Sequence, residues 1–208
     1  MKHCILDNIP TGGASRIRNR LCLLLLFVGM AVGAKGQDVA IKTNLVSDAL
    51  LSPELGVEIG LAPKWTFNLA GQVNFWDVNQ HKWKHWLLQP ELRYWFCDRF
   101  AGHFLGVHAI GGQYNFGNIR NNISFLGSDF SNLTDYRYQG WAAGAGIAYG
   151  HSWVLSRHWN FEAEIGIGWI YTRYDKYNCQ NCGKKIESDR PHNYFGPTKV
   201  ALMLEYIF

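Results

Sequence analysis

Eight stretches of the chain alternate between apolar and polar residues with a period of two, the pattern of β-strands that bury one face. In the last stretch Val200, Leu202 and Leu204 share one face, and the other face includes the charged residues Lys199 and Glu205. The fifth stretch is rich in glycine, and its facing stays open. We predict strands at 39–49, 54–61, 65–76, 85–96, 100–114, 138–154, 159–174 and 196–208.

The predicted connections alternate in length. Short turns follow the second, fourth and sixth strands, and longer loops at 77–84, 115–137 and 175–195 follow the third, fifth and seventh. Aromatic residues gather at both strand ends, as in the girdles of membrane barrels. Those near the short turns are Trp65, Phe96, Phe100, Trp159, Phe161, Tyr206 and Phe208; those near the long loops are Phe75, Trp76, Trp86, Tyr114, Tyr138, Trp141, Trp169, Tyr171 and Tyr174.

Together these patterns predict an all-β fold, an eight-stranded antiparallel up-and-down transmembrane β-barrel. An even number of strands places both chain termini on the periplasmic side of the membrane. The alternative is a soluble lipocalin-like or avidin-like barrel, in which the apolar face points inward around a ligand.

Residues 1–36 have the features of a signal peptide. Three arginines, Arg16, Arg18 and Arg20, precede an apolar run at 21–32 that is short for a membrane span. Ala34-Lys35-Gly36 supplies small residues at the positions that a signal peptidase reads. We therefore predict cleavage near Gly36/Gln37 and a barrel domain at 37–208; an uncleaved N-terminal anchor is the alternative. An exported chain without a long apolar helix can cross a membrane only as a closed barrel, which predicts the bacterial outer membrane.

The basic character of the chain belongs to this leader. The whole sequence has 20 basic and 16 acidic residues, a formal net charge of +4. Loss of the five basic residues and the one acidic residue in 1–36 leaves the predicted mature chain with fifteen of each. A neutral mature chain gives no electrostatic support for nucleic-acid binding.

Charged residues recur on the face that the barrel prediction turns inward. An eight-stranded interior is just filled by side chains, and charges confined there need partners. We predict a lumen charge network that plugs the barrel, with a narrow ion path or a proton-sensitive gate as the alternative. Its members are Lys42, Glu54, Glu58, Glu91, Arg93, Glu162, Glu164, Lys199 and Glu205.

Two cysteines stand close together in the last predicted loop. Cys179 and Cys182 form a C-x-x-C pair, which suits a short loop disulfide in an oxidising compartment. A zinc site would need further ligands, and a redox pair would need a thioredoxin-like surrounding, which the sequence lacks. We predict the disulfide, with the zinc site and the redox pair as alternatives, and assign no metal and no cofactor.

Catalysis has little support in the sequence. Some eight-stranded outer-membrane barrels modify lipid A, which requires a nucleophile beside a base. His151 and Ser152 are adjacent, and His103 and His108 lie on the fifth strand, but they form no recognisable motif. We predict a protein that is not an enzyme and has no catalytic residues.

Several segments carry a family resemblance. They are the start at Gln37 after the leader, Lys42-Thr43-Asn44-Leu45, Cys179-Gln180-Asn181-Cys182-Gly183 and Tyr194-Phe195-Gly196-Pro197-Thr198-Lys199. The chain resembles a family of Bacteroidota outer-membrane proteins defined by a domain of unknown function, of the small OmpA/OmpX-like barrel type. The resemblance implies a barrel in the cell envelope and brings no catalytic residues.

We therefore expect a non-enzymatic outer-membrane barrel with a structural or surface-interaction role through its extracellular loops. Its expected partners are the lipid bilayer, the barrel-assembly machinery during insertion, and a surface or envelope protein or glycan. The alternatives are a small-solute or ion pore and a lipid A-modifying enzyme.

Overall fold

The computed structural model describes residues 39–78, 81–117, 124–125, 128–129, 137–178 and 185–208. The ring strands are β1 (Val39–Asn44), β2 (Glu54–Ala62), β3 (Trp65–Val78), β4 (His81–Trp95), β5 (Gly102–Gly117), β8 (Arg137–Val154), β9 (Trp159–Tyr177) and β10 (Lys185–Ile207). A five-residue helix, α2 (Leu45–Ala49), follows β1, and two short strands, β6 (Ser124–Phe125) and β7 (Ser128–Asp129), pair with each other. Within these residues no helix is long and apolar enough to cross a membrane.

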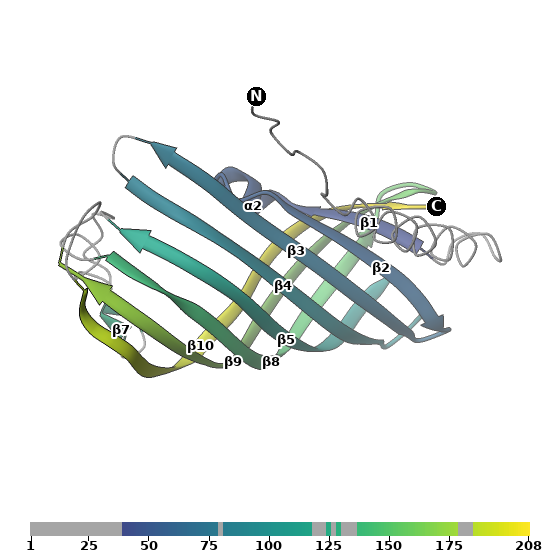
Figure 1. Ribbon diagram of the computed structural model, residues 1–208. Coiled ribbons are helices and arrows are strands. Elements are labelled where there is room, and N and C mark those ends of the chain that lie inside the picture. The colour runs from purple at the N-terminus through teal and green to yellow at the C-terminus, as the bar shows by residue number, and fades with distance from the viewer. Residues whose placement is uncertain (1–38, 79–80, 118–123, 126–127, 130–136, 179–184) are drawn as a thin grey trace, which may run out of the picture. The chain divides into compact units, whose positions relative to one another are not determined.

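The eight long strands form one closed up-and-down sheet (Figure 1). Each strand pairs antiparallel with the next along the chain, and β10 closes the ring against β1, with Ala40 opposite Ile207. The prediction of an all-β ring of eight antiparallel strands is therefore confirmed. Short connections join β2 to β3, β4 to β5 and β8 to β9 at one end, which we call the short-turn end; the other end is the long-loop end.

The ring closes tightly only toward the short-turn end. β1 has six residues and β10 has 23, and the two pair only between Ala40–Asn44 and Met203–Ile207. Before Met203, β10 pairs with β9 alone among the described strands. The long-loop half of the wall is therefore built mainly by β3, β4, β5, β8, β9 and β10.

The first predicted strand is wrong beyond residue 44, where α2 begins. Asn44 caps the helix by accepting a hydrogen bond from the Val46 N–H (3.2 Å), as N-cap residues do. The Asp48 carboxylate accepts bonds from the Thr43 hydroxyl (2.6 Å) and the Glu54 N–H (3.3 Å). These side-chain bonds of Asn44 and Asp48 favour a short helix here, although the apolar alternation of the sequence favours a strand.

Two of the predicted long loops begin too early. β3 and β4 pair out to Val78 and His81, and β9 and β10 pair out to Tyr177 and Lys185. The apolar alternation ends sooner because charged residues interrupt it, such as Asp77 on β3 and Asp175 and Lys176 on β9. Backbone pairing needs no apolar face, so the ladder continues where the sequence pattern has stopped.

The polarity of the ring is inverted relative to a soluble protein. The inward positions hold charged and amide side chains that are nearly inaccessible, such as Lys42, Arg93 and Glu162. The outward positions hold large exposed apolar side chains, such as Leu55 and Val57 on β2 and Ile165 on β9. The chain therefore has the predicted polar interior, and not the apolar, ligand-binding interior of the soluble alternative.

Most of the predicted aromatic girdle residues lie on the outer face, and some do not. Trp65, Phe96 and Trp159 are exposed at the short-turn end, and Phe75, Trp86, Trp141 and Trp169 toward the long-loop end. Phe100 is instead buried, and Tyr114, Tyr138 and Tyr174 share the inward parity of their strands. Strand alternation places the three tyrosines, and Phe100 turns inward from the connection between β4 and β5.

Candidate functional site

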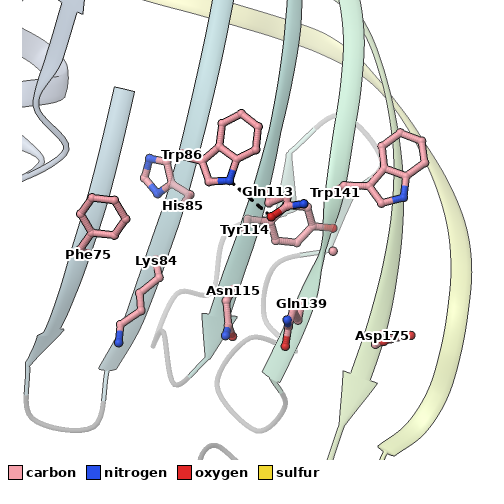
Figure 2. Close-up of a pocket in the computed structure, with 11 residues that line it drawn as sticks. Phe75, Lys84, His85, Trp86, Gln113, Tyr114, Asn115, Gln139, Trp141 and Asp175 are labelled. Atoms are coloured by element: carbon pink, nitrogen blue, oxygen red, sulfur yellow. Dashed lines mark hydrogen bonds between the residues drawn. The ribbon is translucent and has the colours of Figure 1, made fainter. Parts of the chain in front are cut away.

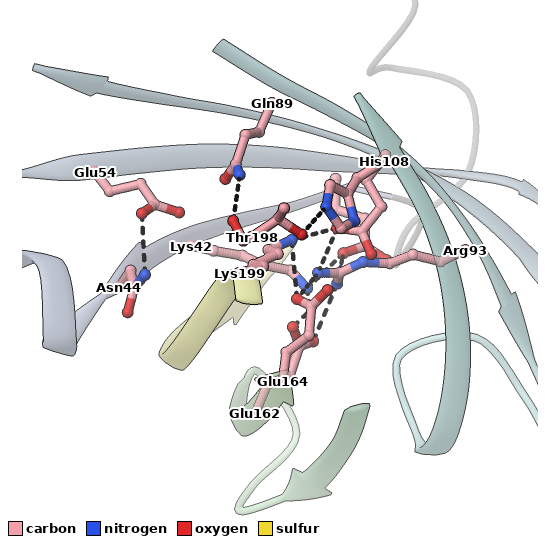
Figure 3. Close-up of polar contacts among 12 residues, drawn as sticks. Lys42, Asn44, Glu54, Gln89, Arg93, His108, Glu162, Glu164, Thr198 and Lys199 are labelled. Atoms are coloured by element: carbon pink, nitrogen blue, oxygen red, sulfur yellow. Dashed lines mark hydrogen bonds and ion pairs between the residues drawn. The ribbon is translucent and has the colours of Figure 1, made fainter. Parts of the chain in front are cut away.

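Side chains from five strands meet inside the ring and form the candidate site (Figure 3). Alternation along each strand directs every second residue inward, so Glu91 and Arg93 on β4, and Glu162 and Glu164 on β9, face the interior together. We call the following set the lumen charge cluster: Lys42 on β1, Glu58 on β2, Glu91 and Arg93 on β4, Glu162 and Glu164 on β9, and Lys199 and Glu205 on β10.

Arg93 lies at the centre of the lumen charge cluster. Its Nη1 lies 2.6 Å from Glu58 Oε2 and 3.1 Å from Glu162 Oε1. Its Nη2 lies 2.7 Å from Glu164 Oε2 and 3.3 Å from Glu91 Oε2. One planar guanidinium therefore joins carboxylates from three strands, which the fixed fork of an arginine can do and the single ammonium of a lysine cannot.

The two lysines extend this arrangement across the ring. Lys42 Nζ contacts Glu58, lies 2.8 Å from Glu162 Oε2, and lies 3.5 Å from Glu205 Oε1. Lys199 Nζ contacts Glu91 and lies 2.9 Å from Glu164 Oε2. Because β4 and β10 stand on opposite sides of the ring order, the contact between Lys199 and Glu91 bridges the interior.

The cluster has more acidic than basic members. Five carboxylates face three cations, and all eight side chains are almost completely buried. Glu205 is the weakest partner, because neither of its carboxylate oxygens accepts a hydrogen bond from a described residue. Since an unpaired buried charge is costly, Glu205 is the member whose charge the cluster least requires.

Glu54, the ninth residue of the predicted network, lies outside the cluster. Its Oε2 accepts hydrogen bonds from Asn44 Nδ2 (3.0 Å) and Ser47 Oγ (2.9 Å), as Figure 3 shows for Asn44. Glu54 therefore connects β2 to the start of α2, using neutral donors in place of a cation.

Apolar side chains fill the ring on the short-turn side of the charges. Trp95 packs on Phe104 with ring centroids 4.7 Å apart and donates from Nε1 to Thr66 Oγ1 (2.9 Å). Phe104 also lies under the Arg93 guanidinium, 4.5 Å from the ring centroid. Phe100 folds inward from the β4–β5 turn in a left-handed conformation (φ 63°) and packs near Trp95. The interior thus has an apolar base beneath its charged layer.

Neutral polar groups border the cluster on the long-loop side. His108 Nε2 lies 2.9 Å from Thr198 Oγ1, and Gln89 Nε2 donates to the Thr198 carbonyl (3.5 Å) (Figure 3). The sequence patterns did not assign His108 to the interior, because the glycines of its strand hid the alternation. The signal was present: His108 has the same parity as the inward Phe104 and Ile110.

The candidate catalytic residues do not assemble into a nucleophile and base. His151 and Ser152 are consecutive on β8 and therefore point to opposite faces, and Ser152 Oγ donates to the Phe100 carbonyl (3.2 Å). Thr198 and His108 do form a hydroxyl–imidazole pair, but His108 Nδ1 has no hydrogen-bond partner among the described residues. An orienting acid, the third part of such a triad, is missing from this pair.

The described part of the chain holds no group of His, Cys, Asp and Glu residues that could bind a metal ion. Cys97, in the β4–β5 turn, is exposed and free. Cys179 and Cys182 lie outside the described residues, so their disulfide stays a prediction, as does the signal peptide at 1–36.

The closed up-and-down sheet, its charged interior and its apolar outer surface place the chain among all-β proteins built as small eight-stranded rings. A family model matches residues 21–208, and the chain belongs to that family, described as "Protein of unknown function (DUF3575)". No curated protein sequence matches the chain. The predicted kinship with a domain of unknown function is confirmed, while its Bacteroidota and OmpA/OmpX-like attributes stay predictions.

Proposed function

We propose that the protein is a non-enzymatic β-barrel of the bacterial outer membrane, closed by its lumen charge cluster, which serves as a structural or surface-interaction protein through its long-loop end. The observation that carries the membrane location is the inverted polarity of the ring. An apolar outer surface around a sheet with a charged interior suits a bilayer, whereas in water it would favour aggregation.

The spacing of the outer aromatic residues supports this location. Trp159 and Trp169 both face outward on β9, and Trp65 and Phe75 both face outward on β3. Each pair is separated by the length of a transmembrane strand, about 9–11 residues. The residues between them on the outer face, such as Ile165 and Ile167, are apolar and exposed.

The interior favours a closed barrel over a pore. Charged side chains from β1, β2, β4, β9 and β10 cross the ring and pair with one another, and Trp95, Phe100 and Phe104 fill the space beneath them. An eight-stranded ring has room for side chains and little else. The buried ion pairs then stabilise the barrel and block it.

The long-loop end supports the interaction role. There β9 and β10 continue past the outer aromatic residues and carry exposed ion pairs, including Arg173 with Asp189 (2.7 Å) and Lys185 with Asp175 (2.7 Å). Such a ladder holds the ends of the strands in register, so that the connections they carry are presented on a stiff support. A surface protein or glycan is the kind of partner that this end would meet.

The first test is the mobility of the membrane-extracted protein in detergent gels, boiled and unboiled, with and without reductant. A membrane barrel should stay folded in cold detergent and change mobility after boiling. Recovery of the protein as a soluble periplasmic species with no heat-dependent shift would refute the membrane location.

Planar bilayers test the closed state separately. The folded wild-type protein should give no steady conductance. Reproducible single-channel steps that vanish when Arg93 or Lys199 is replaced would instead favour the pore. A change in lipid A acyl-chain number between cells with and without the protein would favour the enzyme.

A further inference from the structure

A groove runs across the outer face of the ring near the long-loop end, outside the lumen (Figure 2). Two rows of outward side chains line it, each in register across neighbouring strands. Trp86, Gln113 and Trp141 are paired across β4, β5 and β8. Lys84, Asn115, Gln139 and Asp175 form the next row toward the loops, across β4, β5, β8 and β9.

The groove has the size and the lining of a binding site. Its volume is about 330 Å³, which lies within the range of small-molecule sites. Trp86 Nε1 donates to Gln113 Oε1 (3.4 Å), which holds the amide between the two indole rings. Asn115 also lines the groove, and its Oδ1 is buried and accepts no hydrogen bond from any described residue, so its amide has an unused acceptor.

The second row carries charges of both signs. The Asp175 carboxylate accepts the Asp189 N–H at Oδ1 (2.9 Å) and pairs with Lys185 at Oδ2 (2.7 Å), so its charge is balanced from β10. Lys84 contributes an ammonium with three N–H donors to the opposite side of the groove. The lining therefore combines flat aromatic faces, amide groups and a cation, and Asp175 does not repel an anion strongly.

The position of the groove selects the kind of ligand. Trp86 and Trp141 belong to the outer aromatic girdle, and the polar row begins one step beyond them. If the ring spans a membrane as proposed above, the groove lies where acyl chains give way to headgroups. Indole faces suit the C–H surface of a sugar ring, amides suit its hydroxyl groups, and an ammonium suits a phosphate.

We propose that this groove binds the headgroup of a phosphorylated glycolipid of the surrounding outer leaflet. The sugar ring lies against Trp86 and Trp141, its hydroxyl groups meet Gln113 and Asn115, and its phosphate meets Lys84. This inference rests on the proposed membrane location. The site is separate from the lumen charge cluster, because its side chains point to the opposite face of the sheet.

Binding of defined lipids to the folded full-length protein tests the inference. Native mass spectrometry would follow the titration of detergent-solubilised protein with diphosphorylated lipid A, dephosphorylated lipid A and phosphatidylglycerol. Lys84→Gln and the double variant Trp86→Leu/Trp141→Leu alter the groove. Lys64→Gln and Trp65→Leu/Trp159→Leu are matched controls at the short-turn end, where those tryptophans are 42 and 44 % exposed, against 41 and 43 % for the groove pair.

We expect the wild type to bind diphosphorylated lipid A more tightly than either other lipid. Each groove variant should weaken that binding about tenfold, which is the loss of one charge-assisted or stacking contact, and the controls should not change it. Dephosphorylated lipid A should be insensitive to Lys84→Gln.

Equal binding by groove and control variants, or equal binding of phosphatidylglycerol and lipid A, would overturn the glycolipid site. The boiled and unboiled gel of the same samples keeps the two proposals apart. A sample that shows the heat shift but no selective binding refutes the groove alone, whereas a sample without the shift refutes the membrane location itself.

Discussion

The short-turn half and the long-loop half of the ring share the same strand alternation, but their inward side chains differ in kind. In the short-turn half the interior is filled by the lumen charge cluster and by Trp95 and Phe104. In the long-loop half neutral polar groups make the inward bonds, such as that of Tyr114 Oη with Thr172 Oγ1 (2.6 Å), which joins β5 to β9. The wall also differs, because β1 and β2 reach only part of the way toward the long-loop end.

The difference suggests that the short-turn half stabilises the fold, while the long-loop half carries the connections that would meet a partner. Buried charges hold one another only where a complete wall excludes water and fixes their positions. Where the wall is incomplete, neutral groups and exposed ion pairs suffice. We therefore expect mutations of equal chemistry to cost much in the short-turn half and little in the long-loop half.

The largest effect should come from Arg93→Met, which keeps much of the side-chain volume and removes the central cation. Four carboxylates lose a partner, so we expect destabilisation of about 3–5 kcal/mol, the usual result of breaking a buried ion pair from one side. The urea midpoint of unfolding in detergent micelles measures it.

A partial rescue would assign this loss to charge. Adding Glu58→Gln to Arg93→Met removes one of the stranded carboxylates, so the double variant should recover some of the stability. An Arg93→Met midpoint equal to that of the wild type would contradict the central role of Arg93, and a double variant that is less stable still would point to packing.

A smaller loss is expected from Gly106→Ala on the inner face of β5. A Cβ built at Gly106 would lie 2.0 Å from Glu91 Oε1, so the carboxylate would have to leave its place in the cluster. Overpacking of this kind costs about 1–3 kcal/mol. Gly111→Ala is the control: no described atom lies within 4 Å of its Cβ, and the same unfolding titration should show a neutral or slightly stabilising effect.

Much of the architecture could be predicted from the sequence because a lipid-facing strand imposes a strict period of two. The inward assignments of Lys42, Arg93 and Glu162 follow from that period alone. The period says nothing about the partners across the ring, which depend on register. Glu54 has the same parity as Glu58, yet it bonds to Asn44 and Ser47 because a helix interrupts the wall beside it.

The external groove could not be predicted for the same reason. Trp86, Gln113 and Trp141 are far apart in the sequence, and only the pairing of β4 with β5 and of β5 with β8 aligns them. From the sequence, Trp86 and Trp141 are assigned as single residues to a general aromatic girdle, and Gln113 is given no role. Glycine-rich β5 added to the difficulty, because its outward residues are not a continuous apolar set.

Glu54→Ala should loosen α2, which lies at the boundary between the two halves, without affecting the rest of the ring. This change removes the acceptor for Asn44 Nδ2 and Ser47 Oγ, and leaving such donors unsatisfied costs about 1–3 kcal/mol. We expect faster amide hydrogen exchange in α2 with little change in the cluster strands. Glu54→Gln, which keeps an acceptor oxygen, should stay close to the wild type; uniform loss of protection around the whole ring would contradict a local role.

A near-neutral result is expected from Glu205→Gln, although this residue is as deeply buried as Arg93. The cluster has surplus negative charge, and the Glu205 oxygens accept no hydrogen bond from a described residue. Removing one charge should change the free energy of unfolding by less than about 1 kcal/mol. A loss comparable to that of Arg93→Met, in the same urea titration, would show that the charge count does not decide stability in the short-turn half.

The smallest effect is expected in the long-loop half, at the Asp175–Lys185 pair on the ends of β9 and β10. The hydrogen bond from Lys185, followed by that from the Asp189 N–H, lowers the pKa of the Asp175 carboxyl below its ordinary value. A lowered folded-state pKa gives stability that is present above the unfolded pKa and is lost as the pH falls through the folded value. Lys185 is exposed and Asp175 is partly exposed, so screening by solvent keeps that contribution small. Asp175→Asn should therefore leave the urea midpoint at neutral pH unchanged.

A titration followed at the carboxyl carbon of Asp175 should still show a pKa below the ordinary value, and Lys185→Gln should return that pKa toward the ordinary value. A large midpoint loss for Asp175→Asn would mean that the long-loop half depends on charge as the short-turn half does.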